Sequence, residues 1–589
     1  GVYSRLATAP TLAQPRPTHR RVARPAVCLS LRRPVLRTAQ RARVLSGIDP
    51  TAAQDTFWDA VVVGTGVGGA TAGLALAAAG WKVLFCERGR AATPEGFAGT
   101  YAEQLGAGTA EVLRSAGRWP TAVEDLSAGK AVAFVPFVGC GAGGSSALYG
   151  MAMERLFPAD FVPGRSHPEV ADALVPERWP VDYNDLAPYY ARAERLYRVR
   201  GSSDPLRPDL AALMPAPPAT AAADALSRHL SARGLHPYRL PCACEYVDGC
   251  SSCQGYLCPR DCKNDSARVA LRPAVARYGA ALLDECEVVR MNAGRRAVSS
   301  LECLCKDRPV TVRGRVLVLA AGALQTPALL LRSTSAEWPD GLANESALVG
   351  RNLMRHLIEL YALRVPGGPP ADNRRKEIAF NDFYVHDGVK LGTVQSFGRL
   401  PPAEIVARSI KEEIRAGSGR WLLPLLRLGA PMLRGYLRRM IDTRLTLATM
   451  VEDLPYPHNR VEPSKNIERS IAVHYRPGPY ERQRVARMRA LMRSALEPIG
   501  YRRIDETGNN RRIAHACGTC RFGSDPRTSV LDPDCRAHGL DNLYVVDSSV
   551  FPTSGGTNPS LTIAANALRV AGRLTGRTAE LPGQDAPWT

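Results

Sequence analysis

The chain has 589 residues, of which 45% are hydrophobic and 22% are charged, and its formal net charge is +20. These proportions are typical of a globular protein with a large core, and they exclude a collagen-like or wholly disordered chain. Residues 1–48 hold ten arginines, no lysine and no acidic residue, so this segment carries half of the excess charge. The remainder has a modest basic bias and no patch of interleaved basic and aromatic residues, which argues against nucleic acid as a partner.

The Arg-rich leader, which we take as residues 1–54, resembles an organelle transit peptide in composition. We expect it to be disordered or to direct targeting, and we exclude it from the predicted fold. Arg20-Arg21 is the start of a twin-arginine export signal only if an apolar stretch follows, and no clean one does. A cytoplasmic or organellar location is therefore favoured over export.

The first strong motif is the turn Gly64-Thr65-Gly66-Val67-Gly68-Gly69, which lies between an apolar run at 60–63 and an Ala/Leu-rich run at 70–79. The two runs predict a strand and a helix, and 82–86 predicts a second strand that ends at Glu87. In such a unit the glycines allow a tight turn, close approach of a pyrophosphate and close helix packing, while an acidic residue binds the adenosine ribose. The predicted dinucleotide contacts are Gly64, Gly66, Gly69 and Glu87.

Two later segments also suit backbone that lies close to a flat ligand. Gly139–Met151 is dense in glycine and includes Gly143, Gly144 and Ser145; its alternative is an ordinary glycine-rich turn. Val316–Ala321 predicts a strand, and Gly322–Pro327 predicts the start of a helix with Pro327 in its first turn, where a missing N–H costs nothing. A further strand is predicted at 543–547, and a helix at about 560–574.

In this order, the motifs resemble those of the glucose-methanol-choline (GMC) flavoprotein oxidoreductases, from about residue 57 to residue 578. The resemblance is carried by the nucleotide motif, Gly143–Ser146, Gly322–Pro327, Val349–Leu353 with His356, and the block His515–Ala567. It implies an α/β fold with a discontinuous Rossmann-type FAD-binding domain at 55–160, 263–348 and 506–589. It also implies an α+β substrate domain, built on an antiparallel sheet, at 161–262 and 349–505.

The resemblance further implies oxidation of an alcohol by hydride transfer to flavin N5. An imidazole with a pKa near working pH suits removal of the hydroxyl proton, and His515 is the candidate base. Asn558 is the second catalytic candidate, because its amide can donate to and accept from the substrate oxygen. His356 is expected to be structural. The flavin contacts implied are Gly143, Gly144, Ser145, Val288, Asp547, Ser548, Asn558 and Pro559.

The expected substrate is a small alcohol, namely a sugar, an aminosugar, a cyclitol or a sterol-like molecule. A dehydrogenase would pass the electrons to a cytochrome or a quinone, whereas an oxidase would pass them to dioxygen. The same active site serves both, because the acceptor is set by access to the reduced flavin. A flavin-dependent lyase or photoenzyme of the same fold is a third alternative, which the pair His515 and Asn558 disfavours.

Six of the 15 cysteines lie between residues 242 and 262. Cys250, Cys253, Cys258 and Cys262 have spacings that suit four thiolate ligands of an iron–sulfur cluster or a zinc ion. Some sugar dehydrogenases of the resembled family carry an iron–sulfur cluster in a cysteine-rich insertion, which the Cys258-Pro259 segment resembles, and such a cluster would favour a dehydrogenase. The alternative is two or three disulfides, which require an oxidising compartment.

The segment 420–440 mixes large apolar residues with arginines. Such a composition suits peripheral contact with a membrane surface. The alternative is a helical hairpin that covers the mouth of the active site and keeps its arginines in solvent.

Overall fold

The computed structural model describes residues 45, 47–91, 110–167, 170–207, 213–365, 375–416, 429–505, 507, 510, 513 and 515–577. Most of the predicted leader lies outside these residues. Its last part is folded, because α2 (Pro50–Asp55) buries Ala53 and the Ile48 N–H donates to the Leu282 carbonyl at 2.8 Å. The folded body therefore begins before residue 55, earlier than the sequence predicts.

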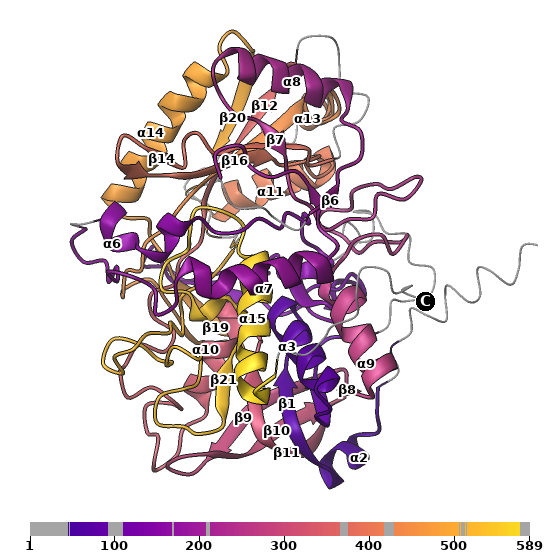
Figure 1. The fold of residues 1–589 in the computed structure, drawn as a ribbon, viewed down its shortest axis with the longest axis vertical. Helices are drawn as coiled ribbons and strands as arrows, with labels where there is room; N and C mark the ends of the chain where they lie inside the picture. The colour runs from indigo at the N-terminus through magenta and orange to yellow at the C-terminus, as the bar shows by residue number, and fades with distance from the viewer. Residues whose placement is uncertain are drawn as a thin grey trace, which may run out of the picture. The chain divides into compact units, whose positions relative to one another are not determined.

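A parallel sheet forms one part of the fold, seen below the centre of Figure 1. Its neighbouring strands are, in order, β8 (Ala281–Leu283), β2 (Val83–Cys86), β1 (Phe57–Val63), β11 (Arg308–Leu319) and β21 (Leu543–Val545). The Val61–Val63 run of β1 is buried, as is usual for a parallel strand with both faces covered. Strand β1 leads through the glycine turn into α3 (Val67–Ala78), so the predicted strand, turn and helix are all present.

Strand β11 belongs to two ladders. Its second half pairs with β1, and its first half pairs with β10 (Val298–Cys305) in an antiparallel ladder that continues to β9 (Cys286–Ala293). This hairpin extends the parallel sheet beyond the dinucleotide unit. Its strand β9 brings Val288 to the cavity described below.

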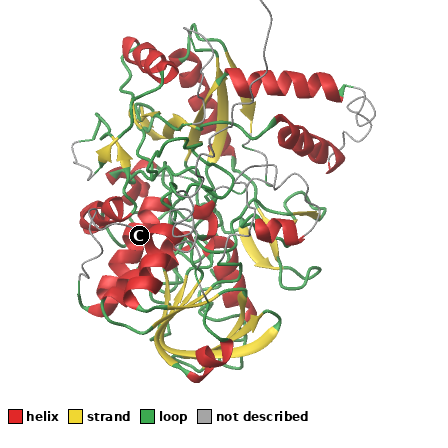
Figure 2. Cartoon of the chain, turned by 90° about the vertical axis from the view of Figure 1, so that its right-hand side faces the viewer, coloured by secondary structure: helices red, strands yellow, loops and turns green. Residues whose placement is uncertain are grey.

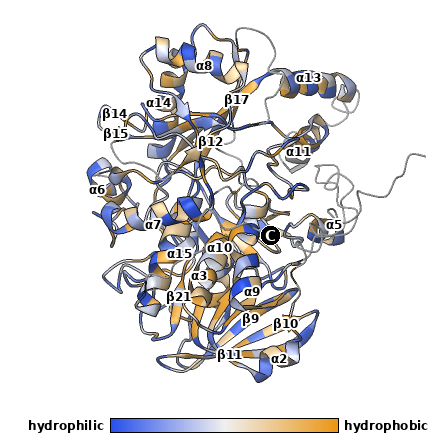
Figure 3. Cartoon of the chain, turned by 45° about the vertical axis from the view of Figure 1, so that its right-hand side comes forward, coloured by the Kyte–Doolittle hydropathy of each residue, from blue (hydrophilic) through white to orange (hydrophobic). Residues whose placement is uncertain are grey.

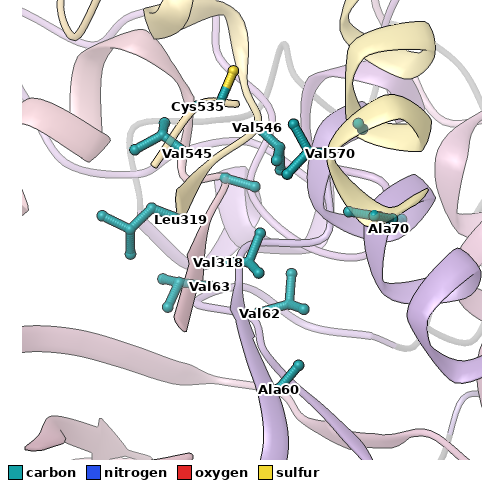
Figure 4. Packing of buried hydrophobic residues seen from close by; sticks show 14 of the residues in the cluster. Ala60, Val62, Val63, Ala70, Val318, Leu319, Cys535, Val545, Val546 and Val570 are labelled. Atoms are coloured by element: carbon teal, nitrogen blue, oxygen red, sulfur yellow. The ribbon is translucent and has the colours of Figure 1, made fainter. Parts of the chain in front are cut away.

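Small and branched side chains make up the core above the parallel sheet, where Val62, Val318 and Val546 lie close to Val570 and Ala70 (Figure 4). Helix α3 packs on α15 (Ser560–Thr575), and α15 packs on α7 (Tyr183–Leu196). Glycine makes these approaches close, because a Cβ at Gly68 would collide with the Val546 carbonyl. Helix α7 lies in a segment predicted for the substrate domain, yet it packs on the helices of the parallel sheet, so the predicted boundary at residue 161 does not separate two packing units.

A six-stranded antiparallel sheet forms the upper part of Figure 1, and both sheets are seen from another side in Figure 2. Its order is β20 (Tyr501–Asp505), β12 (Leu357–Leu363), β17 (Leu445–Val451), β16 (Gly392–Ser396), β13 (Ile378–Phe380) and β7 (Tyr238–Arg239). Side chains of β12 alternate between two cores. Tyr361 shares one core with α8 (Ala221–Ala232) and α14 (Pro479–Ala495), and Leu360 shares the other with α11 (Ala403–Ala416) and α13 (Ala430–Thr443).

A four-stranded sheet joins segments that the sequence assigns to different domains. Its order is β18 (Arg460–Pro463), β19 (Ile471–His474), β3 (Val123–Asp125) and β4 (Val132–Phe134). The remaining helices are α5 (Ala110–Ser115), α6 (Pro163–Ser166), α9 (Arg272–Tyr278) and α10 (Gly322–Arg332), with shorter turns at Gly144–Ala147, Pro158–Phe161, Ala267–Leu271 and Ser548–Val550. The remaining strands are β5 (Arg200–Gly201), β6 (Met214–Pro215), β14 (Val385–His386) and β15 (Val389–Lys390).

Hydropathy follows the burial of these elements. The strands of the parallel sheet are mainly hydrophobic, whereas α13 shows a mixed surface (Figure 3). Among the described residues, no helix has both the length and the apolar character needed to cross a bilayer.

Candidate functional site

A cavity of about 1320 Å³ is lined by residues of both large sheets. It exceeds the roughly 300–1,000 Å³ usual for one small ligand, so it has room for a dinucleotide and a second molecule. Most of the predicted site residues line it: Gly64, Gly66, Glu87, Gly144, Ser145, Val288, His515, Asp547, Ser548, Asn558 and Pro559. Two predicted contacts, Gly69 and Gly143, do not line it and instead shape the backbone beside it.

The N-terminus of α3 faces this cavity through Gly66, Val67 and Gly68. Gly66 caps the helix without a side-chain hydrogen bond, which leaves N–H groups of the first turn available to an anion. Gly64 has a φ of +96°, and a Cβ at Gly69 would collide with the Gly64 carbonyl. This glycine cradle and its free N–H groups fit the pyrophosphate of FAD.

Glu87 lies at the end of β2 and joins three loops. One carboxylate oxygen accepts from the Thr65 N–H at 3.1 Å and hydroxyl at 2.6 Å, and the other accepts from Gly89 N at 2.9 Å and Gly141 N at 3.0 Å. Burial raises the pKa of this carboxyl, and the hydrogen bonds oppose that shift. Glu87 thus fastens the glycine turn to the second glycine-rich segment, a role that the sequence does not predict. Its contact with a ribose stays a prediction.

Asp547 has a similar fastening role at the end of β21. Its carboxylate accepts from Gly322 N at 2.8 Å, the Thr326 hydroxyl at 2.5 Å and Ser549 N at 2.8 Å. The start of α10 and the segment after β21 are therefore held together beside the cavity. Ser548 donates its hydroxyl to the Ala516 carbonyl at 2.7 Å, which ties the same segment to the residue after His515.

His515 and His356 form a hydrogen-bonded pair across the cavity wall. Their Nδ1 atoms are 2.8 Å apart, and Nε2 of His356 is 2.9 Å from the Gly555 carbonyl. A carbonyl only accepts, so Nε2 of His356 carries a proton, and in the neutral ring its Nδ1 is an acceptor. His515 must then donate from Nδ1. Its Nε2 therefore keeps a lone pair, which is what a base needs. The sequence assigns His356 only a structural role, and the structure shows it setting the tautomer of His515.

The surroundings keep both imidazoles neutral. Burial lowers the pKa of His515 well below its usual value, and the neighbouring His356 and Lys376 lower it further. Burial also lowers the pKa of His356. His515 is thus unprotonated near neutral pH and able to accept a proton.

Asn558 lies directly before α15 and is held from the antiparallel sheet. The Gln395 amide N–H donates to Asn558 Oδ1 at 2.8 Å, and Asn558 Nδ2 lies 3.8 Å from the Met450 sulfur. Because Oδ1 already accepts from Gln395, the Asn558 amide N–H is the group best placed to meet a substrate oxygen. The oxygen of Gln395 is buried without a partner among the described residues.

Sequence reasoning does not find Gln395, Met450 or Lys376, all of which line the cavity. Gln395 and Met450 lie on the central strands β16 and β17. The alternation of side chains along a strand predicts which residues share a face, but not which residues or ligands that face contacts. Lys376 precedes β13 and belongs to no motif. No local signal marks these three residues, because the cavity gathers them from separate parts of the chain.

The cysteine-rich segment brings several sulfurs close together. The sulfurs of Cys244, Cys250 and Cys262 lie within 4.8 Å of one another, with Cys244–Cys250 at 3.8 Å, Cys250–Cys262 at 3.5 Å and Cys258–Cys262 at 3.5 Å. Thiolates at about 2.3 Å from one tetrahedral ion lie about 3.8 Å apart, and two thiolates on the same iron of a [2Fe–2S] cluster have a similar spacing. This group includes Cys244, which the spacing does not select, and metal binding by Cys250, Cys253, Cys258 and Cys262 stays a prediction. None of the described cysteines forms a disulfide.

A second compact group of sulfurs, Cys86, Cys286 and Cys303, lies in the core beside the parallel sheet and is fully buried. No motif of the sequence pairs these three cysteines. They meet because β2 and the hairpin of β9 and β10 converge next to the cavity, which Cys86 and Cys286 line.

Comparison with known proteins agrees with this geometry. Family models described as GMC oxidoreductase match residues 59–358 and 455–567. Paromamine 6'-oxidase of Streptomyces fradiae is 32% identical over 89% of this chain and 92% of its own length, and 2-methyl-1,2-propanediol dehydrogenase of Mycolicibacterium austroafricanum is 26% identical over 89% and 96%. The crystal structure of pyridoxine 4-oxidase from Mesorbium loti has the same fold, with a TM-score of 0.59 and 20% identity over 88% of this chain and 99% of that one.

The matched residues include the glycine cradle, Glu87, His356, His515 and Asn558, and the relatives are oxidases and dehydrogenases of alcohol groups. The chain therefore belongs to the GMC oxidoreductases, a family of FAD-dependent enzymes.

Proposed function

We propose that this enzyme oxidises an alcohol to a carbonyl compound, with His515 as the base and Asn558 as the group that orients the hydroxyl. The parallel sheet and its glycine cradle are proposed as the Rossmann-type FAD-binding part. The antiparallel sheet is proposed as the substrate wall. The single observation that carries the proposal is the chain of hydrogen bonds from the Gly555 carbonyl through His356 to His515, which leaves a lone pair on Nε2 of His515.

The groups that would hold FAD are the N-terminus of α3, the Gly144-Ser145 backbone and the segment from Asp547 to Pro559. When bound, FAD supplies a hydride acceptor at its N5 atom. The protein's own contribution is then to remove the hydroxyl proton and to align the alcohol. The Asn558 amide N–H would donate to the alcohol oxygen while the hydroxyl proton moves to Nε2 of His515. The N-terminus of α15 would stabilise negative charge on a ring next to Pro559.

The charge balance of the His pair supports this assignment. A proton accepted at Nε2 makes His515 an imidazolium, and its Nδ1–H bond to His356 is then charge-assisted and stronger. His356 keeps its own Nε2 proton on the Gly555 carbonyl and needs no change of tautomer. The base can therefore gain and lose its proton without rearrangement of the pair.

The test begins with protein purified without oxygen, whose visible spectrum reports flavin. Iron and acid-labile sulfide are assayed on the same sample, and we expect flavin bands without stoichiometric iron or sulfide. Alcohols drawn from sugars, aminosugars, cyclitols, diols and long-chain alcohols are then mixed with the flavoprotein under anaerobic conditions. We expect at least one class to bleach the flavin and yield a carbonyl product. Protein that holds flavin but is not reduced by any class would contradict the proposal.

Reoxidation of the reduced protein then identifies the acceptor class. The relatives include both an oxidase and a dehydrogenase, and either acceptor is compatible with the same base. Rapid reoxidation by dioxygen with formation of peroxide supports an oxidase. Slow reoxidation by dioxygen and fast reoxidation by a quinone supports a dehydrogenase.

A further inference from the structure

The cavity wall on the antiparallel-sheet side carries positive but no negative charge among the described residues. Its apolar surface comes from Ile358, Leu360, Phe397, Leu400, Ala448 and Met450. Its charged side chains include Lys376 and Arg408. The carboxylates that line the cavity are Glu87, Glu287 and Asp547, and all three follow or lie on strands of the parallel-sheet side.

Lys376 is a cation of this wall that has no counter-ion among the described residues. Among the residues that the structure describes, no carboxylate forms an ion pair with it; its Nζ lies 5.6 Å from the centre of the Phe397 ring. The ammonium also lies against Gly150, where a Cβ would collide with Nζ and approach Gln254 Oε1 at 2.7 Å. The Lys376 ammonium thus occupies the space that a side chain at position 150 would fill.

The ammonium is costly to hold in this place. Burial lowers the pKa of Lys376 to about 8, and the nearby Cys242 thiol opposes that shift only in part. At pH 7 most of the lysine is still protonated. A partly buried charge without an ionic partner is unfavourable, and an anion that enters the cavity would supply that partner.

We propose that Lys376 binds an anionic group of the substrate, a carboxylate being the simplest, so that the substrate is an alcohol with an apolar body and one negative charge. This inference rests on the proposed oxidation of an alcohol at His515 and Asn558. The hydroxyl would lie at these two residues, the carbon skeleton along the apolar wall and the anion at Lys376. An amino alcohol would instead bring its positive charge towards the Lys376 ammonium, and the two like charges would repel.

The experiment compares three probes of equal chain length: an ω-hydroxycarboxylic acid, its methyl ester and the corresponding ω-amino alcohol. Anaerobic reduction of the flavin gives a rate constant and an apparent Kd for each probe. For the wild-type protein we expect the acid to be favoured over the ester by about 10- to 100-fold in the ratio of rate constant to Kd, the usual range for a hydrogen bond to a charged group. We expect the amino alcohol to be the poorest probe.

Three variants separate charge from shape. Lys376→Met should abolish the preference for the acid, mainly through a higher Kd for the acid, so that the acid and the ester have similar ratios of rate constant to Kd. Lys376→Glu should reverse the order towards the amino alcohol. Lys306→Met is the matched control, because it removes one positive charge from an exposed side chain that does not line the cavity, and it should retain the wild-type order. The flavin spectrum of each variant shows that it has folded and holds its cofactor.

Some results would overturn the inference but leave the proposed function standing. One is a wild-type protein that reduces its flavin equally well with the acid and the ester, and another is a Lys376→Met variant that keeps the preference for the acid. An equal loss of rate for all three probes in Lys376→Met would also overturn it, because the lysine would then act on the flavin or on His515 and not on the substrate anion. If no alcohol of any charge reduces the bound flavin, the proposed function itself fails, and the inference fails with it.

Discussion

The two large sheets contribute to one cavity in different ways. The parallel sheet contributes mainly backbone, namely glycine turns and a helix N-terminus, and the carboxylates Glu87 and Asp547 hold its loops together. The antiparallel sheet contributes side chains, such as Gln395 and Met450, that project from alternate positions of its strands. Backbone can hold a cofactor common to many enzymes, whereas side chains can change one at a time. Under the proposed assignment, cofactor binding and substrate choice are encoded in different parts of the chain.

The largest effect is expected at His515, where the two sides meet. His515→Ala removes the proposed base and should slow reduction of the flavin by about two to four orders of magnitude, the usual contribution of a positioned base. The flavin spectrum should be unchanged, because the glycine cradle is intact. Stopped-flow absorbance measures the rate, with His458→Ala, at an exposed histidine outside the cavity, as the control. A wild-type rate in His515→Ala would remove the proposed role.

On the parallel-sheet side, Gly69→Ala should disrupt cofactor binding. The new Cβ would collide with the Gly64 carbonyl and lie 2.9 Å from Ala320 Cβ, and such overpacking usually costs about 1–3 kcal/mol of stability. We expect a lower flavin content and a lower melting temperature, measured by absorbance and calorimetry. Gly435→Ala, at a helical glycine with open space around it, is the control and should retain flavin fully. Equal flavin content in both variants would show that the tight turn is not needed.

On the antiparallel-sheet side, Gln395→Leu should leave flavin binding intact and lower the rate of reduction about tenfold. The substitution removes the N–H that holds Asn558 Oδ1, and a lost hydrogen bond to a neutral group is worth about 0.5–1.5 kcal/mol. Met450→Leu, an apolar replacement of similar volume beside the same amide, is the control and should have a smaller effect. Loss of flavin in Gln395→Leu would contradict the division, because the antiparallel sheet would then also be needed to bind the cofactor.

The smallest effect is a shift in pH dependence. The folded-state pKa of His515 lies below its unfolded value, so between the two values the unfolded chain binds more protons than the folded chain. The usual pKa of histidine is about 6.5. Because His515 stays neutral below that pH in the folded protein, flavin reduction should remain fast there. The folded state should lose stability as the pH falls from the unfolded pKa towards the folded pKa. His356→Gln removes one cause of the lowered pKa and should move the acid limb of the rate profile to higher pH. An acid limb that does not move would show that His356 does not influence His515.

The sequence predicts the parallel-sheet side in detail because its signals are local. A turn that needs positive φ at Gly64 requires glycine, and the flanking apolar runs fold as the predicted strand and helix. The candidate base and amide are also local, since His515 and Asn558 belong to one C-terminal block. Ten of the twelve residues predicted to bind the cofactor line the cavity; Gly69 and Gly143 lie behind it.

The sequence predicts the substrate wall poorly because its contacts are distant along the chain. Gln395 meets Asn558 and His356 meets His515 only after the antiparallel sheet has formed. The cysteine-rich segment shows the same limit. Spacing selects Cys250, Cys253, Cys258 and Cys262, but the fold brings in Cys244 from before the segment. Spacing along a loop does not determine which sulfurs approach one another.

The order of strands in the parallel sheet has a consequence for how the enzyme is made. Strand β1 is synthesised early. Its partner β11 follows only after strand β7 of the antiparallel sheet and the cysteine-rich segment, and β21 follows near the C-terminus. During synthesis the N-terminal part of a chain folds first, and pairing between strands that are distant in sequence is slow. The flavin cradle therefore stays incomplete until synthesis is almost finished, and a chain that ends before β21 lacks both the last strand of the sheet and Asn558.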